Sequence, residues 1–229
     1  YGDKSPESII KYSQQIINFF INQNVDLIVV ACNSASSVAL KYLQSNYNIP
    51  IIGTIEPSIN EAVNYLSGNT IGIIGTETTI TSKAYNKAFS KYPDYKIHSI
   101  ACPLFVPIVE EGWEHTDIAH QIATKYLSQF QNSNLDTIIL ACTHYPMLLD
   151  TLQSVFDRLG FKQLHFIQSG GAIVDYLNQN TSLIIESQNH SPLLNSYDQF
   201  YITDTPHQFN NLANRFLGEE LHNIKLISL

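Results

Sequence analysis

The strongest constraint on the fold is a short pattern that occurs twice, far apart in the chain. Asp26 begins an apolar run that ends in an Ala-Cys pair at Cys32, and Asp136 begins a similar run that ends in an Ala-Cys pair at Cys142, with identical spacing. Short, unbroken apolar runs rich in β-branched residues are typical of parallel strands covered on both faces. The repetition therefore predicts two similar halves, each with a buried strand that ends at a cysteine.

Other apolar runs alternate with helical stripes, which indicates an α/β fold with parallel sheets. We expect strands at residues 27–31, 49–52, 70–74, 96–100, 137–141, 165–167 and 200–203. We expect helices from Ser5 to Ile21, from Asn33 through Leu43, at 61–66, 81–90, 116–130 and 147–159, after Gly171, and at 206–217. Residues 181–200 are polar and are expected to be rich in loops. A second, shorter echo joins Ile51-Ile-Gly-Thr54 to Ile73-Ile-Gly-Thr76.

Composition narrows the possible partners and the compartment. The net charge is −8 and there is no basic run, so neither nucleic acid nor an anionic membrane is an expected partner. No stretch reaches the roughly 18 apolar residues that a membrane helix needs. Three cysteines form no disulfide framework, which favours a reducing cytoplasm. An anionic ligand would have to be held by local donors.

Each of the two matched cysteines is predicted to lie at the carboxyl end of a strand, just before a helix. Ligands of open α/β sheets bind at that edge. The amide groups and dipole at a helix N-terminus would lower the pKa of a thiol there and would hold a carboxylate. Two thiols facing each other suit a racemase, because one removes a Cα proton and the other returns a proton to the opposite face. Cys32 and Cys142 are therefore the predicted catalytic pair of a cofactor-independent racemase.

Neighbouring residues could assist the two thiols. His144 is placed to share or relay the proton of Cys142. The neutral donors Asn33, Ser34 and Thr143 could hold the amino and carboxylate groups of a substrate, and Asn33 and Ser34 could cap the helix after Cys32.

Cysteines also have three other common roles in proteins: core packing, metal binding and redox chemistry. Inert core packing is the common fate of a cysteine and is the interpretation we prefer for Cys102. A metal site is not expected, since no second ligand pair has metal-site spacing. A redox pair would call for CxxC, which the sequence lacks.

Several segments resemble the glutamate racemases of the aspartate/glutamate racemase superfamily. ACNSAS at 31–36 and ACTHYP at 141–146 are similar to the two signature motifs, and IGIIGTETTITSKAY at 71–85 and ACPLFVPIVEEG at 101–112 resemble further blocks in the same order. Tyr1-Gly2 with Lys4-Ser5 resembles the end of the family's Pro-Tyr-Gly-x-Lys-Ser loop. The resemblance extends to about residue 178.

This resemblance implies two pseudosymmetric three-layer α/β domains with mostly parallel sheets and the active site in the cleft between them. The first domain would comprise residues 1–62 plus 172–229, and the second residues 63–171. The implied reaction is the interconversion of L- and D-glutamate without cofactor or metal, supplying D-glutamate for bacterial peptidoglycan. The expected partners are the small-molecule substrate and, as is frequent in the family, a second copy in a homodimer.

The resemblance also assigns roles to individual residues. Cys32 and Cys142 match the two thiols, and His144 matches the acid/base helper of the second. Glu110 matches the acidic residue of the second domain, with Glu111 as the alternative. The positions that match substrate contacts are Tyr1, Gly2, Asn33, Ser34, Thr76, Thr79 and Thr143. Ser34 stands where the family more usually has Thr, a change that keeps the hydroxyl.

One departure concerns the start of the chain. Family members begin with a strand ending in Asp-Ser-Gly-x-Gly-Gly, and a second acidic residue precedes the Pro-Tyr-Gly loop. Neither is in the printed sequence. We expect the sequence to be N-terminally incomplete. The alternatives are a related racemase acting on aspartate or a hydantoin, and a non-catalytic binding protein that keeps the fold.

Overall fold

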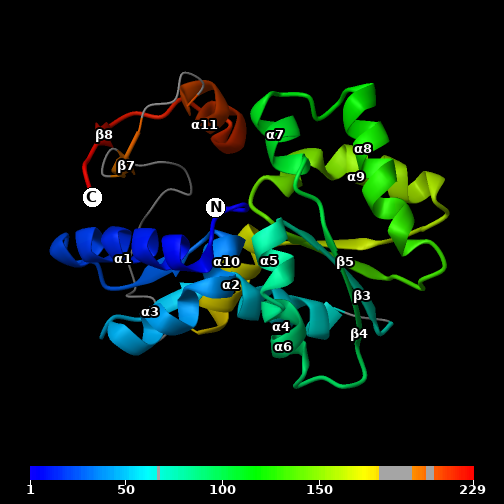
Figure 1. Ribbon diagram of the computed structural model, residues 1–229, viewed down its shortest axis with the longest axis horizontal. Coiled ribbons are helices and arrows are strands. Elements are labelled where there is room, and N and C mark those ends of the chain that lie inside the picture. Colours follow the sequence, from blue (N-terminus) through cyan, green and yellow to red (C-terminus); the bar gives the residue numbers. More distant parts are fainter. Residues whose placement is uncertain (66–67, 181–197, 205–208) are drawn as a thin grey trace. The chain divides into compact units, whose positions relative to one another are not determined.

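The computed structural model of the protein describes residues 1–65, 68–180, 198–204 and 209–229. The chain divides into two compact units, residues 1–183 and 184–229. Figure 1 shows the helices and strands of both. The proposed domains, 1–62 plus 172–229 and 63–171, are a different division of the chain and stay a prediction.

A four-stranded parallel sheet organises the first unit. Its order is β4-β3-β5-β6, with all neighbours parallel. The strands are β3 (Thr70–Gly75), β4 (Lys96–Ala101), β5 (Thr137–Ala141) and β6 (His165–Gln168). Every residue of the central strands β3 and β5 is buried, as the unbroken apolar runs predicted. The α/β fold with parallel sheets is therefore confirmed.

Helices cover both faces of this sheet, which makes three layers (Figure 1). One face packs against α7 (Phe105–Glu110), α8 (Asp117–Leu127) and α9 (Leu149–Arg158). The other packs against α4 (Ile55–Tyr65), α6 (Ala84–Phe89) and α10 (Ser169–Gln179). Side chains alternate between the faces: Ile138 and Leu140 enter the first core, and Ile139 and Ala141 the second.

The smaller sheet of this unit pairs β1 with β2 in parallel. Its strands are β1 (Ile28–Val30) and β2 (Ile51–Gly53), and its helices are α1 (Pro6–Asn22), α2 (Asn33–Val38) and α3 (Leu40–Asn46). The predicted helix start is confirmed, because the Ser5 hydroxyl accepts a hydrogen bond from the backbone N–H of Ser8. The expectation that β1 is covered on both faces is wrong. Ile28 and Val30 enter the core, whereas Val29 points the other way and is 38% exposed.

Several predicted boundaries were wrong. Cys32, not Asn33 or Ser34, occupies the N-cap of α2, and no side chain caps that helix. The helix predicted at 81–90 begins later, as α6, because Lys83 has a positive φ of 56°. The preceding helix α5 (Glu77–Thr81) was not predicted. The helix α7 was not predicted, since Pro107 and its short length weaken the helical pattern.

The second unit contains a two-stranded parallel sheet and one described helix. Its elements are β7 (Phe200–Ile202), α11 (Phe209–Leu217) and β8 (Ile224–Leu226). The strand β8 was not predicted, and residues 181–197 and 206–208 of the predicted loop and helix lie outside the described residues. None of the helices in the described ranges is long and apolar enough to cross a membrane.

Candidate active site

The two matched cysteines lie close enough to influence each other. Cys32 follows β1 and Cys142 follows β5, both at the carboxyl ends of their strands, as predicted. Cys142 is buried, and burial raises the pKa of its thiol to about 12, with a smaller upward contribution from the charge of Cys32. The two repeated segments also meet through Ser169, whose hydroxyl lies 3.1 Å from Nδ2 of Asn33 and 3.5 Å from the carbonyl oxygen of Leu140.

The expected lowering of the thiol pKa is wrong for Cys142. Backbone N–H groups of His144 and Tyr145 do act to lower the pKa, but loss of solvation outweighs them. The element after Cys142 is the short 3₁₀ turn η2 (Tyr145–Leu148), and the α-helix α9 begins only at Leu149. Cys142 is therefore a neutral thiol at neutral pH.

His144 forms a pair with Glu110. Its Nε2 lies 3.2 Å from Oε1 of Glu110, at the end of α7, and its Nδ1 lies 3.4 Å from Oγ1 of Thr143. Burial lowers the pKa of the imidazole, while the Glu110 carboxylate acts to raise it. Between the two neighbouring acids that the sequence left open, the geometry favours Glu110. Glu111 follows α7 as its C-cap residue.

Three of the predicted substrate contacts share one buried cluster of hydroxyl groups. Ser34 Oγ lies 2.9 Å from Thr76 Oγ1 and 3.4 Å from Thr79 Oγ1. The two threonine hydroxyls lie 3.0 Å apart, and Thr76 also caps α5 by accepting from the backbone N–H of Thr79. Because hydroxyls can both donate and accept, this cluster can turn toward either end of a zwitterion.

The first residues of the chain pack against the same cluster. The carbonyl oxygen of Gly2 accepts from the backbone N–H of Thr78 at 3.1 Å and from its hydroxyl at 2.9 Å. A Cβ at Gly2 would come within 2.7 Å of Thr76 Cγ2. Tyr1 stacks on Tyr12, and its pKa is raised by burial and then by the charge of Cys32. Tyr1 and Gly2 therefore lie beside the thiol and hydroxyl groups, and their contact with substrate stays a prediction.

Asn33 belongs to a buried polar network that the sequence did not reveal. Its Oδ1 accepts from Tyr85 OH at 2.7 Å and from Thr54 Oγ1 at 2.8 Å, and its Nδ2 donates to Ser169 Oγ at 3.1 Å. All four residues are at most 5% exposed. The repeated Ile-Ile-Gly-Thr pattern was the one sequence feature that pointed to this network, since it makes Thr54 the counterpart of Thr76.

Cys102 lies apart from this chemistry. It is fully buried in the core beneath α7, and burial raises the pKa of its thiol. Nothing in its surroundings activates it, which supports the prediction of an inert core cysteine.

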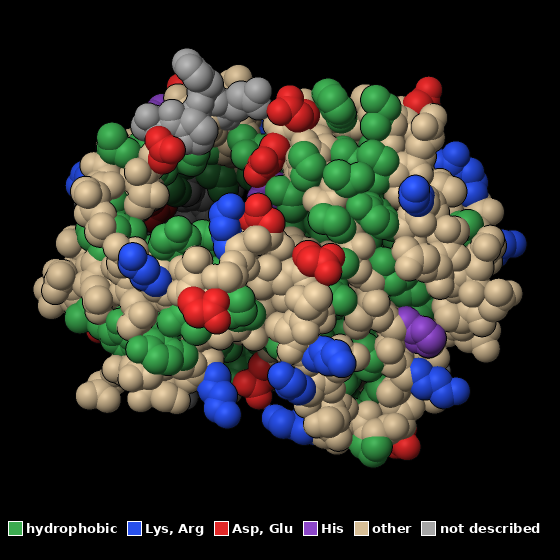
Figure 2. Space-filling view, viewed as in Figure 1, with side chains coloured by type: hydrophobic (Ala, Val, Ile, Leu, Met, Phe, Trp, Pro, Cys, Tyr) green, Lys and Arg blue, Asp and Glu red, His purple; other side chains and the backbone are tan. Residues whose placement is uncertain are grey.

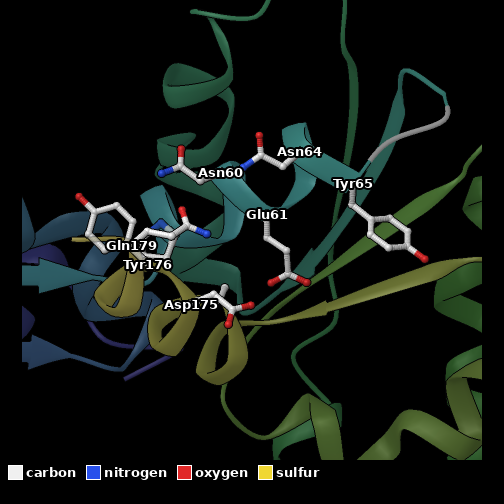
Figure 3. Close-up of a pocket in the computed structure, with 9 residues that line it drawn as sticks. Asn60, Glu61, Asn64, Tyr65, Asp175, Tyr176 and Gln179 are labelled. Atoms are coloured by element: carbon white, nitrogen blue, oxygen red, sulfur yellow. The ribbon is translucent and has the colours of Figure 1, made fainter. Parts of the chain in front are cut away.

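Two hollows of the first unit lie away from the cysteines. A cavity of about 190 Å³ between α4 and α10 contains Glu61 and Asp175, whose carboxylates point toward each other in Figure 3. Nε2 of His165 lies 3.3 Å from Oε1 of Glu61. A groove of about 720 Å³ is lined by α2, α3, α4 and α6, and Figure 2 shows Lys and Arg side chains gathered along that edge. Within the described ranges, no group of three His, Cys, Asp or Glu residues is arranged to hold a metal.

Comparison with known proteins decides the family. A protein family described as "Asp/Glu/Hydantoin racemase" matches residues 5–177 of the chain. The chain belongs to this family. Among its relatives, the glutamate racemase of Geobacter metallireducens is 36% identical over 100% of this chain and 83% of its own length.

Solved structures agree with this membership. The glutamate racemase of Francisella tularensis, determined in complex with D-glutamate, is 31% identical with a TM-score of 0.84 and covers 100% of this chain and 83% of its own. The glutamate racemase isoform RacE1 of Bacillus anthracis is 30% identical with a TM-score of 0.87, covering 100% and 84%. The two thiols therefore belong to a chain with the fold of this racemase family.

Proposed function

We propose that this protein is a glutamate racemase that interconverts L- and D-glutamate with two cysteine bases and no cofactor. The observation that carries the proposal is the placement of Cys32 and Cys142 at the carboxyl ends of the repeated strands β1 and β5, whose segments meet through Asn33, Ser169 and the carbonyl oxygen of Leu140. The names of the relatives and the D-glutamate bound to the Francisella tularensis structure support glutamate as the substrate.

The proposed reaction moves one proton at a time. One cysteine, as a thiolate, removes the Cα proton, and the electron pair of the C–H bond passes into the substrate carboxylate. The other cysteine, as a thiol, donates its proton to the opposite face of Cα. The neutral, buried state of Cys142 in the free protein suits the donor role in one direction. In the other direction His144, paired with Glu110, assists in removing that proton.

Substrate binding is proposed to depend on neutral donors. The chain carries a net charge of −8, so its overall field does not attract a substrate with two carboxylates. The hydroxyls of Ser34, Thr76 and Thr79, with Thr143 and the Tyr1-Gly2 backbone, supply short-range hydrogen bonds instead.

The wider biological setting follows from the reaction. D-Glutamate made in this way supplies peptidoglycan synthesis. The proposed domains, 1–62 plus 172–229 and 63–171, would each contribute one thiol. We further propose that the protein works in the cytoplasm, where its three free cysteines stay reduced, and that it forms a homodimer.

A substrate panel tests the proposal. Purified full-length protein is incubated separately with L- and D-glutamate, L- and D-aspartate and a 5-substituted hydantoin, and the enantiomers are separated by chiral chromatography. We expect both glutamate enantiomers to approach a 1:1 mixture, with the other substrates slower by about 100-fold or more. Faster conversion of aspartate or the hydantoin would show that this compound, and not glutamate, is the preferred substrate. No conversion of any compound would favour a non-catalytic binding protein.

A further inference from the structure

A network of buried hydrogen bonds surrounds the side chain that follows Cys32 in the sequence. The two signature motifs at 31–36 and 141–146 do not account for it. Its centre is the side chain of Asn33, the residue after Cys32. The partners come from separate elements: Thr54 at the end of β2, Tyr85 on α6 and Ser169 at the start of α10. Elements that are far apart in the sequence therefore meet at one amide group.

Two hydroxyl groups donate to the oxygen of that amide. Burial raises the pKa of Tyr85, so its hydroxyl keeps its proton and donates to Oδ1 of Asn33. The hydroxyl of Thr54 donates to the same oxygen. An amide oxygen has two lone pairs, and both directions are used, which leaves the NH₂ group to face Ser169 and the site.

Ser169 extends the network toward the second thiol. Its hydroxyl accepts from Nδ2 of Asn33 at 3.1 Å and lies 3.5 Å from the carbonyl oxygen of Leu140. Leu140 belongs to β5, two residues before Cys142. Ser169 thus stands between the residue that follows Cys32 and the strand that ends at Cys142.

We propose that Tyr85 and Ser169 are positioning residues, which hold the Cys32 segment and the Cys142 strand at the spacing that proton transfer across the substrate requires. This inference rests on the proposed racemase reaction. A two-base racemase is sensitive to that spacing, since the carbanion formed by one thiol must be protonated by the other before its proton returns. Displacements of about 1 Å at such sites can lower rates by about 100-fold.

The test compares two rates in the same reaction. Full-length wild type, Tyr85→Phe and Ser169→Ala are incubated with L-glutamate in D₂O. Chiral separation followed by mass spectrometry gives the rate of D-glutamate formation and the rate of Cα deuteration in the recovered L-glutamate. Thr151→Val is the matched control, because its hydroxyl makes an equally buried hydrogen bond, to the carbonyl oxygen of Glu114, outside this network.

We expect racemisation to fall about tenfold in each network variant while deuteration of recovered substrate falls less. The ratio of deuteration to racemisation then rises by at least about threefold, because the deprotonating thiol, once it has exchanged its proton with D₂O, returns a deuteron to the same face of Cα more often. Thr151→Val should keep the wild-type ratio. A merely structural contribution would lower the amount of folded enzyme and would reduce both rates together.

Two outcomes would overturn the inference: wild-type rates in both network variants, or slower rates with an unchanged ratio. If one variant fails to fold, as circular dichroism would report, the other still decides, since the two hydroxyls come from different helices. A wild-type protein that neither racemises nor deuterates glutamate contradicts the proposed function itself, a result distinct from a failure of the positioning residues.

Discussion

Nε2 of His144 lies 3.2 Å from Oε1 of Glu110, although the two residues come from different elements on one side of the main sheet. The imidazole is mostly buried, with 23% of its side chain exposed, whereas half of the Glu110 side chain is exposed. Burial lowers the pKa of His144 and the carboxylate partly offsets this. Glu110 therefore limits how far burial lowers the pKa of the imidazole.

Replacing Glu110 by Gln should lower the pKa of His144 further and slow racemisation. The carboxylate raises the pKa of the imidazole, and Gln keeps the shape without the charge. We expect the histidine pKa, followed by NMR, to fall, and kcat to decrease about tenfold.

Glu111→Gln is the matched comparison for this variant, because the two acids are adjacent and only Glu110 pairs with the imidazole. Its effect on both quantities should be small. An equal or larger effect of Glu111→Gln would show that the wrong acid was assigned to the site.

Cys142 should make the stability of the protein fall at alkaline pH. Its folded pKa of about 12 exceeds the reference value of 9.0, so the folded state holds the thiol proton more tightly than the unfolded chain does. This contribution is fully present below pH 9 and is lost as the pH rises from 9 toward 12. The free energy of unfolding should therefore decline by up to about 1.4 kcal/mol per pH unit from this group.

Urea unfolding at pH 8 and pH 10.5 measures that decline. Cys142→Ser should show a shallower dependence than wild type, because its hydroxyl does not ionise in this range. Identical dependence in the two proteins would mean that Cys142 is not a buried neutral thiol.

Gly2→Ala should weaken substrate binding. The added Cβ would lie 2.7 Å from Cγ2 and 2.8 Å from Cβ of Thr76, closer than real contacts allow. Either the N-terminal loop or Thr76 must move, and Thr76 belongs to the hydroxyl cluster. We expect KM for glutamate to rise about fivefold or more. At Gly170 nothing lies within 4 Å of an added Cβ, so Gly170→Ala should leave KM unchanged.

Ser34→Ala should also act through binding. It removes one of three clustered hydroxyls, at a position that is 3% exposed, and leaves Thr76 and Thr79 bonded to each other. Loss of one neutral hydrogen bond corresponds to a rise in KM of about five- to tenfold. Ser37→Ala, on the same helix, removes a hydroxyl bonded only locally to the Ser34 carbonyl oxygen, and should change KM little. Similar KM changes in both variants would argue against the cluster as a binding element.

The sequence predicted what depends on local pattern. The strands that end near Cys32 and Cys142, and the full burial of the second, follow from unbroken apolar runs, and the start of α1 follows from Ser5 and Pro6. The motif resemblance led to His144 and Glu110, and their pairing is visible in the structure. Choosing between Glu110 and Glu111 required the structure, since both end the same short helix.

Other features depend on contacts that no local pattern contains. The Asn33 network joins residues 136 positions apart, and each partner alone is an ordinary Ser, Thr or Tyr. The pKa of Cys142 was predicted in the wrong direction because the sequence shows the backbone N–H groups that follow the thiol but not the depth of its burial. Burial of a charge in the interior outweighs a few local donors.

The central claim is that both cysteines take part in moving the Cα proton. The most direct test is the Cα deuteration of L- and D-glutamate in D₂O, followed by NMR, with full-length wild type, Cys32→Ser, Cys142→Ser and the control Cys102→Ala. We predict that wild type and Cys102→Ala convert each enantiomer into its mirror image carrying one deuterium at Cα. Each of the other two variants should abolish racemisation. Full racemisation by Cys32→Ser or Cys142→Ser, or no deuteration of either enantiomer by wild type, would contradict the two-thiol account.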